Sequence, residues 1–72
     1  MKNKYYDENI IIDFEIPYYL QESIDNLLKE RKKKDSLKVD LFVDEFISEC
    51  NSAYYDGKIN HDQRAKLRDK YL

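Results

Sequence analysis

The chain has 72 residues and a mass of 8.8 kDa, with 39% charged residues and a net charge of −2. A chain of this length buries only roughly 60% of its unfolded surface, which is too little for a cofactor fold, a cleft and a catalytic scaffold together. We therefore expect a single domain over residues 1–72 that is not an enzyme. Ten aromatic residues with one Gly and one Pro predict a mainly α protein and argue against a disordered chain.

Segments that direct a chain to or through a membrane are missing from the sequence. No apolar run approaches the roughly 20 residues that a membrane span needs, and residues 1–8 contain no apolar stretch of the kind a secretory signal carries. The only cysteine, Cys50, excludes an internal disulfide and suits a reducing compartment. These features predict a cytoplasmic protein without membrane contact.

One strand is predicted near the N-terminus, over residues 10–16. The even-numbered positions are all apolar, whereas the odd-numbered positions hold Ile11, Asp13 and Glu15, as in a strand with one buried face. A lone strand leaves its backbone groups without partners. Either residues 4–6 fold back on it as a hairpin, or it pairs with the same segment of a second chain. We favour the second arrangement, a homodimer through residues 10–16.

Three helices are predicted after this strand, so the expected order of elements is β-α-α-α. The first covers about residues 18–33 and follows Pro17, which presets the backbone for a first helical turn. The second begins after a capping residue, Asp35 or Ser36, and continues to about residue 55.

The third helix is predicted over about residues 61–71. Gly57 is the expected left-handed residue after the second helix, and Asn60 with Gln63 forms the pattern of a capping box. The residues expected in the core of the three helices are Leu20, Ile24, Leu27 and Leu28; Val39, Val43, Phe46, Cys50 and Ala53; and Leu67, Tyr71 and Ala65.

Charge is distributed along the chain in alternating blocks. Residues 1–28 carry −4, residues 29–38 carry +4, residues 39–56 carry −5 and residues 57–72 carry +3. Such blocks are typical of solvated helix faces that pair within the chain. The alternative is a bipolar surface that docks on another charged macromolecule.

A zinc site at the second turn is a further hypothesis. Cys50 and His61 flank the turn, and Asp56 or Asp62 would supply a third ligand, because zinc accepts thiolate, imidazole and carboxylate. The alternative is that Cys50 is an ordinary core residue.

The segment of about residues 10–55 resembles the ribbon-helix-helix family. The resemblance lies in Ile12-Asp13-Phe14-Glu15-Ile16-Pro17, Leu20, Ile24-Asp25, Leu27-Leu28 and Ser36. It implies a dimeric DNA-binding repressor or antitoxin whose paired strands read the major groove through Ile11, Asp13 and Glu15. Carboxylates at those positions would oppose a polyanion, so we expect no binding to free nucleic acid.

Residues 53–63 and 67–72 resemble the ending of small accessory proteins from phages and mobile elements of Gram-positive bacteria, a group that includes anti-CRISPR proteins. This resemblance implies a non-enzymatic inhibitor of a CRISPR-associated nuclease in the bacterial cytoplasm. The chain would occupy a basic surface on the nuclease and block nucleic-acid loading. The residues expected to bind the partner are Asp40, Asp44, Glu45, Glu49, Tyr54 and Tyr55. A scaffold or assembly role remains a third reading.

Overall fold

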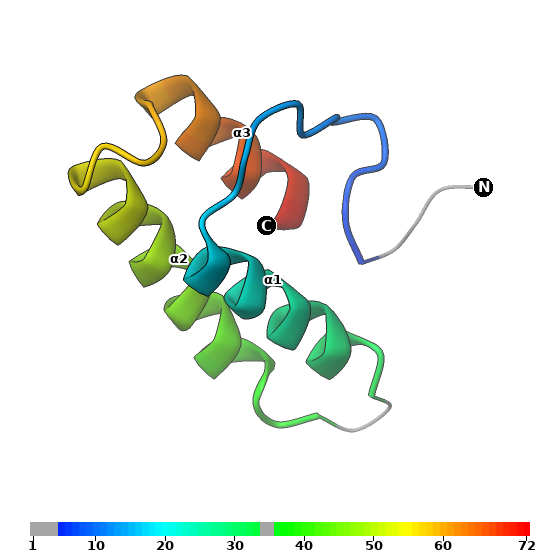
Figure 1. Ribbon diagram of the computed structural model, residues 1–72. Helices are drawn as coiled ribbons and strands as arrows, with labels where there is room; N and C mark the ends of the chain where they lie inside the picture. Colours follow the sequence, from blue (N-terminus) through cyan, green and yellow to red (C-terminus); the bar gives the residue numbers. More distant parts are fainter. Residues whose placement is uncertain (1–4, 34–35) are drawn as a thin grey trace.

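The computed structural model describes residues 5–33 and 36–72, and that part of the chain contains three helices (Figure 1). The helices are α1 (Tyr18–Arg31), α2 (Val39–Tyr55) and α3 (His61–Tyr71). α1 and α2 lie side by side, and α3 packs against α2 after a short turn (Figure 1). The predicted mainly α class is confirmed. In the described ranges, no helix combines the length and the apolar character needed to cross a membrane.

The three helices share one hydrophobic core. Its buried side chains are Leu20, Ile24 and Leu27 of α1, Phe46, Cys50 and Ala53 of α2, Leu67 and Tyr71 of α3, and Ile59 of the second turn. The periodicity of the sequence predicted all of these except Ile59. Ala65, expected in the core, is exposed because it lies on the outer side of α3.

α2 begins later than predicted. Its N-terminal cap is Lys38, which makes no capping hydrogen bond through its side chain. Ser36 lies two residues earlier, where its Oγ accepts a hydrogen bond from the Lys38 N–H (3.2 Å) and donates one to Glu30 Oε1 (2.9 Å). The serine therefore ties the connection between α1 and α2 to a buried glutamate instead of capping the helix. Asp35, the other predicted cap, lies outside the described residues.

The turn between α2 and α3 forms as predicted. Gly57 has a φ of +74°, the left-handed conformation that glycine adopts at little cost. Asn60 Oδ1 accepts a hydrogen bond from the Gln63 N–H (2.7 Å), and Gln63 Oε1 accepts one from the Asn60 N–H (2.9 Å). This reciprocal pair is the predicted capping box.

The predicted strand over residues 10–16 is wrong, since the described residues contain no strand. Residues 5–16 instead form an irregular arm that crosses α3 and leads into α1 (Figure 1). The alternation of the arm is nevertheless kept: its even-numbered side chains from 10 to 16 are half-buried, while Ile11, Asp13 and Glu15 are exposed. A strand requires a second strand for its ladder, and the arm lies against helices, which offer none.

Arg31 at the end of α1 holds the first part of the arm. Its Nη1 donates hydrogen bonds to the carbonyls of Tyr5 (2.8 Å) and Tyr71 (2.5 Å), and so joins the arm, α1 and α3. Burial lowers the pKa of the Arg31 guanidinium, which stays charged at all ordinary pH values. A cation therefore supplies donors that a neighbouring strand would have supplied.

Lys70 on α3 holds the next part of the arm. Its Nζ donates hydrogen bonds to the carbonyls of Asp7 (3.0 Å) and Ile10 (2.6 Å), and the Asp7 N–H donates to the Lys70 carbonyl (2.8 Å). The ammonium also lies 4.9 Å from the centre of the Tyr6 ring, within the range of a cation–π contact. Lys70 thus anchors the arm to α3 through the backbone carbonyls of the arm and through the ring of Tyr6.

Candidate protein-docking surface

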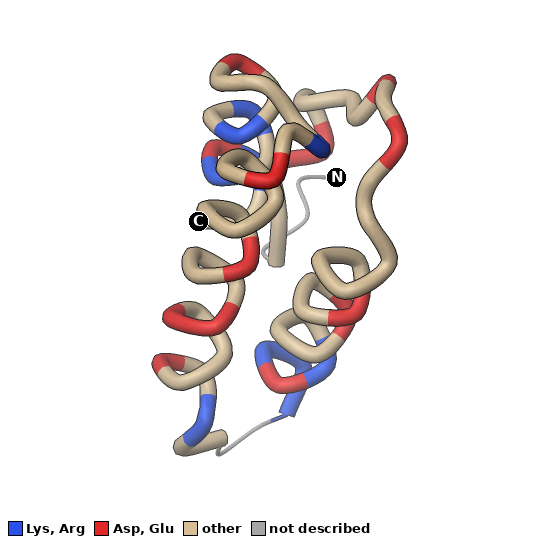
Figure 2. Tube along the Cα trace, turned by 60° about the vertical axis from the view of Figure 1, so that its left-hand side comes forward, with Lys and Arg blue, Asp and Glu red and all other residues tan. Residues whose placement is uncertain are grey.

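The acidic residues of α2 lie along its solvent-exposed side. Asp40, Asp44 and Glu45 are all exposed, and none of them makes a hydrogen bond or ion pair within the part of the chain that is described. Figure 2 shows acidic positions recurring along α2 and no basic position within the helix. Ion pairs within the described chain therefore do not neutralise these three carboxylates. The expectation that the charge blocks pair with one another does not hold for them.

Two large apolar side chains are exposed on the same side of α2. The exposed fractions are 63% for Leu41 and 79% for Tyr55. Leu41, Asp44, Ser48 and Tyr55 follow one another at spacings of three, four and seven residues, which places them on one stripe of the helix, about 21 Å from end to end. We call the exposed residues on this side the α2 outer face: Asp40, Leu41, Asp44, Glu45, Ser48, Ser52 and Tyr55.

Glu49 does not belong to this face, although it was predicted with the other acids. It is half-buried and faces Tyr19 at the start of α1. Burial raises the pKa of the Tyr19 phenol, and the nearby carboxylates of Asp56 and Glu49 raise it further. The Tyr19 hydroxyl is itself buried without a hydrogen-bond partner in the described structure. Glu49 is thus less exposed than the other acids that were predicted with it.

Tyr54 and Tyr55, predicted together, have different surroundings. The Tyr54 ring is half-buried under Arg64, whose guanidinium lies 4.1 Å from the ring centre, and it also contacts the ring of His61 at 6.3 Å. Arg64 Nη1 donates a hydrogen bond to Asn51 Oδ1 at 3.3 Å. Tyr54 therefore holds the corner between α2 and α3, and Tyr55 is the ring available to a partner. Adjacent positions on a helix point about 100° apart, and the helical spacing already places Tyr54 beside the apolar seam of α2 and Tyr55 away from it.

The predicted zinc ligands are not brought together. Within residues 5–33 and 36–72 there is no group of three or more His, Cys, Asp or Glu side chains that could hold a metal ion. Cys50 is fully buried in the core, and burial raises the pKa of its thiol to about 11. His61 is exposed on the other side of the turn, with its Nδ1 3.5 Å from Arg64 Nη2, and Asp56 is exposed. Cys50 thus behaves as the core residue that was the alternative.

Comparison with known proteins adds no constraint to this geometry. The chain matches no family model, no curated protein and no solved structure.

Proposed function

We propose that this protein is a non-enzymatic binding module that docks its α2 outer face on a basic surface of another protein. The supporting observation is that three unpaired carboxylates and two exposed apolar side chains lie on one face of one helix. Carboxylates at the rim of such a face speed and orient the encounter with a basic surface. Leu41 and Tyr55, near its two ends, are side chains that lose their exposed apolar area only when a partner covers them.

We further propose that the partner is a CRISPR-associated nuclease in a bacterial cytoplasm. This step rests on the resemblance of the last third of the chain to small accessory proteins of phages. A channel that binds guide or target nucleic acid must be lined with Lys and Arg to neutralise phosphates. A row of carboxylates on a rigid helix competes for the same cations, so the docked module would exclude the nucleic acid from the channel.

The test compares two triple variants of equal charge. Asp40→Asn, Asp44→Asn and Glu45→Gln together neutralise the α2 outer face and keep the size of each side chain. The matched control neutralises three exposed acids elsewhere, Glu8→Gln, Glu22→Gln and Asp69→Asn. An exposed ion pair contributes up to about 1 kcal/mol, so the first variant should bind the nuclease roughly tenfold to a hundredfold more weakly. The control should bind within about threefold of the wild type.

The measurements are direct binding by calorimetry against a panel of purified CRISPR nucleases, and target cleavage with increasing amounts of the protein. Equal losses in the two triple variants would show that net charge matters and the α2 outer face does not. Undiminished cleavage by every nuclease in the panel would end the inhibitor proposal. Binding without inhibition would leave the docking module and remove the blocking mechanism.

We also propose the homodimer through residues 10–16. The backbone groups of residues 11–16 make no hydrogen bond within the described chain, which leaves them open to a second copy. Light scattering over a hundredfold range of concentration should then detect a dimer that Phe14→Asp dissociates or unfolds. A monomer of full helical content at all concentrations would refute the pairing.

A further inference from the structure

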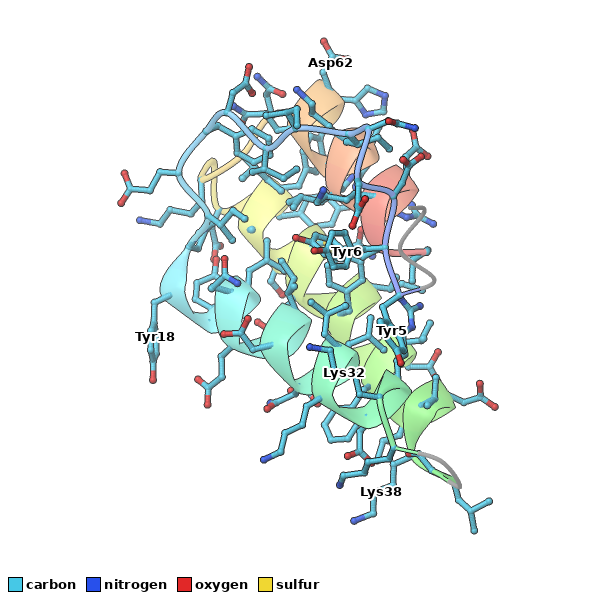
Figure 3. The ribbon with its side chains drawn as sticks, turned by 90° about the vertical axis from the view of Figure 1, so that its right-hand side faces the viewer. Tyr5, Tyr6, Tyr18, Lys32, Lys38 and Asp62 are labelled. Carbon is cyan, nitrogen blue, oxygen red and sulfur yellow. The ribbon has the colours of Figure 1, made fainter. Side chains whose placement is uncertain are left out.

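The end of the molecule where α1 is connected to α2 is strongly basic. Lys29, Lys32, Lys33 and Lys38 are all exposed there, from the last turns of α1 to the residue before α2. Figure 2 shows basic positions at the neighbouring ends of both helices, and Figure 3 shows Lys32 and Lys38 at this same end. We call these four lysines, together with the leucines described next, the basic pole.

Two leucines are exposed among these lysines. Leu37 has an exposed fraction of 98%, the highest among the large apolar residues that are exposed in the described structure, and Leu41 has 63%. The two lie four residues apart, so they follow one another along the start of α2. A chain this small needs its apolar side chains for its core. Leu41 also belongs to the α2 outer face, so Leu37 is the exposed leucine that the docking proposed above leaves unexplained.

Within the described structure, two of the four lysines at the pole make no direct contact that holds the fold together. The side chains of Lys29 and Lys38 make no hydrogen bond or ion pair within the described residues. Lys33 pairs with Glu30 at 2.6 Å, and Lys32 lies 6.0 Å from the centre of the Tyr5 ring. The only arginine of this region, Arg31, is directed inward to the arm.

We propose that the basic pole binds the surface of a membrane that contains anionic lipids. Leu37 and Leu41 would enter the boundary between headgroups and acyl chains, and the lysine ammonium groups would lie against the phosphates and carboxylates of the headgroups. Lysine suits this position because its apolar stem can follow the leucines while its ammonium stays in water. An apolar insertion beside a cluster of basic residues is the combination that gives reversible binding to anionic membranes.

Nucleic acid fits the same residues less well. A duplex offers phosphates to the lysines, but its backbone gives the leucines no apolar environment. The exposed cations are all lysines, whereas planar, bidentate recognition of phosphates and bases favours arginine. The acidic stretch of α2 only partly offsets the pole: Asp44 lies within one turn of Leu41, but about 9 Å along the helix from Lys38, which is about one Debye length at physiological salt. Asp40 is nearer and offsets one of the four charges, and Glu30, which pairs with Lys33, offsets a second.

This inference goes beyond the docking of the α2 outer face and revises the expectation of no membrane contact. That expectation considered only segments that span or enter a bilayer, whereas the pole would lie on its surface.

The experiment measures partition of the full-length protein onto vesicles by co-sedimentation. With vesicles of phosphatidylcholine and phosphatidylserine in a 3:1 ratio we expect binding that weakens with salt, and with phosphatidylcholine alone we expect little. A lysine near such a surface contributes about 1 kcal/mol, so Lys38→Ser should lower the partition constant roughly fivefold. Lys58→Ser, at the exposed turn outside the pole, is the matched control and should change it less than twofold.

The leucines decide between a lipid surface and a general polyanion. Leu37→Ser with Leu41→Ser should keep the helical content, since both residues are exposed, and should lower the partition constant at least tenfold. If the double variant binds the vesicles as well as the wild type, or if a 20-base-pair DNA duplex binds as tightly as the vesicles, the pole is a site for polyanions and the proposal fails. It also fails if the folded wild type does not bind the 3:1 vesicles at low salt.

Discussion

The N-terminal arm and the turn between α2 and α3 are both irregular, but they are held in opposite ways. The turn is fixed within a few residues: Gly57 takes up the left-handed conformation, and Asn60 and Gln63 exchange hydrogen bonds three positions apart. The arm is fixed by cations on distant parts of the chain, Arg31 and Lys70. Neighbouring residues thus determine the conformation of the turn. The arm takes its conformation only once the helices that hold it have assembled.

The largest loss of stability is expected on removing the guanidinium of Arg31, which joins the arm, α1 and α3. Arg31→Met keeps the apolar stem and removes the donors to the carbonyls of Tyr5 and Tyr71. Hydrogen bonds to charged groups contribute roughly 1.5–3 kcal/mol each, so the free energy of unfolding should fall by about 3 kcal/mol. Urea unfolding measures it, with Lys29→Met as a control that removes an exposed cation of the same helix. Equal losses in both variants would show that the arm does not depend on Arg31.

Lys70 should contribute somewhat less, because it joins the arm to α3 alone, whereas Arg31 joins the arm to both α1 and α3. Lys70→Met should lower the free energy of unfolding by about 2 kcal/mol. Hydrogen exchange should become faster at the amides of residues 5–10. The amides of α2 should slow down or speed up only as much as the change in the free energy of unfolding requires. If exchange accelerates uniformly over the molecule, the arm and the helices unfold as one unit and the contrast between the two regions is lost.

The capping box should give a smaller and strictly local loss. Asn60→Ala removes the acceptor for the Gln63 N–H, which typically costs about 1 kcal/mol. For a domain of this size that corresponds to a fall in melting temperature of roughly 4–8 °C. Asn60→Asp, which keeps an acceptor at the positive end of the helix, should retain the wild-type value. A loss equal to that of Arg31→Met would contradict the ranking.

The smallest effect concerns the buried Glu30, which links α1 to the connection before α2. Hydrogen bonds from Lys33 and Ser36 lower the pKa of this carboxyl below its usual value of 4.5. The charged form is therefore the one stabilised by folding. Its contribution is present above pH 4.5 and is lost as the pH falls through the lowered pKa. Melting temperatures from pH 7 to pH 3 should decline less steeply for Glu30→Gln than for the wild type; parallel curves would contradict the linkage.

Sequence patterns predicted those parts of the fold that depend on near neighbours. The core positions of α1 and α2, the turn at Gly57 and the capping box follow from spacings of two to four residues. The strand was predicted wrongly because alternation reports only which side chains are covered, and helices cover the arm as well as a sheet would. The start of α2 was misplaced because Ser36 binds Glu30, a contact that depends on how the connection folds.

The sequence predicted only part of the candidate site, because it does not show which side chains the neighbouring helices cover. The acids at 40, 44 and 45 are exposed, as their helical spacing indicates. Glu49 and Tyr54 were assigned to the same surface, but both are half-buried, and Tyr54 packs against the core and under Arg64. Residue type alone could not separate them from the exposed acids and Tyr55, because side chains of the same type on one helix differ in the direction they point and in what covers them.

The anchoring of the arm by α3 also affects the order in which the protein folds during synthesis. The carbonyls of Asp7 and Ile10 leave the ribosome before their donor on Lys70, which follows 63 and 60 positions later. Until α3 has emerged, an isoleucine-rich segment with strong β propensity lacks the part of its cover that α3 provides. Such a segment is prone to aggregate while it waits. Docking of the arm is therefore expected as the last step of folding, and slow translation of the second half of the chain would prolong the vulnerable interval.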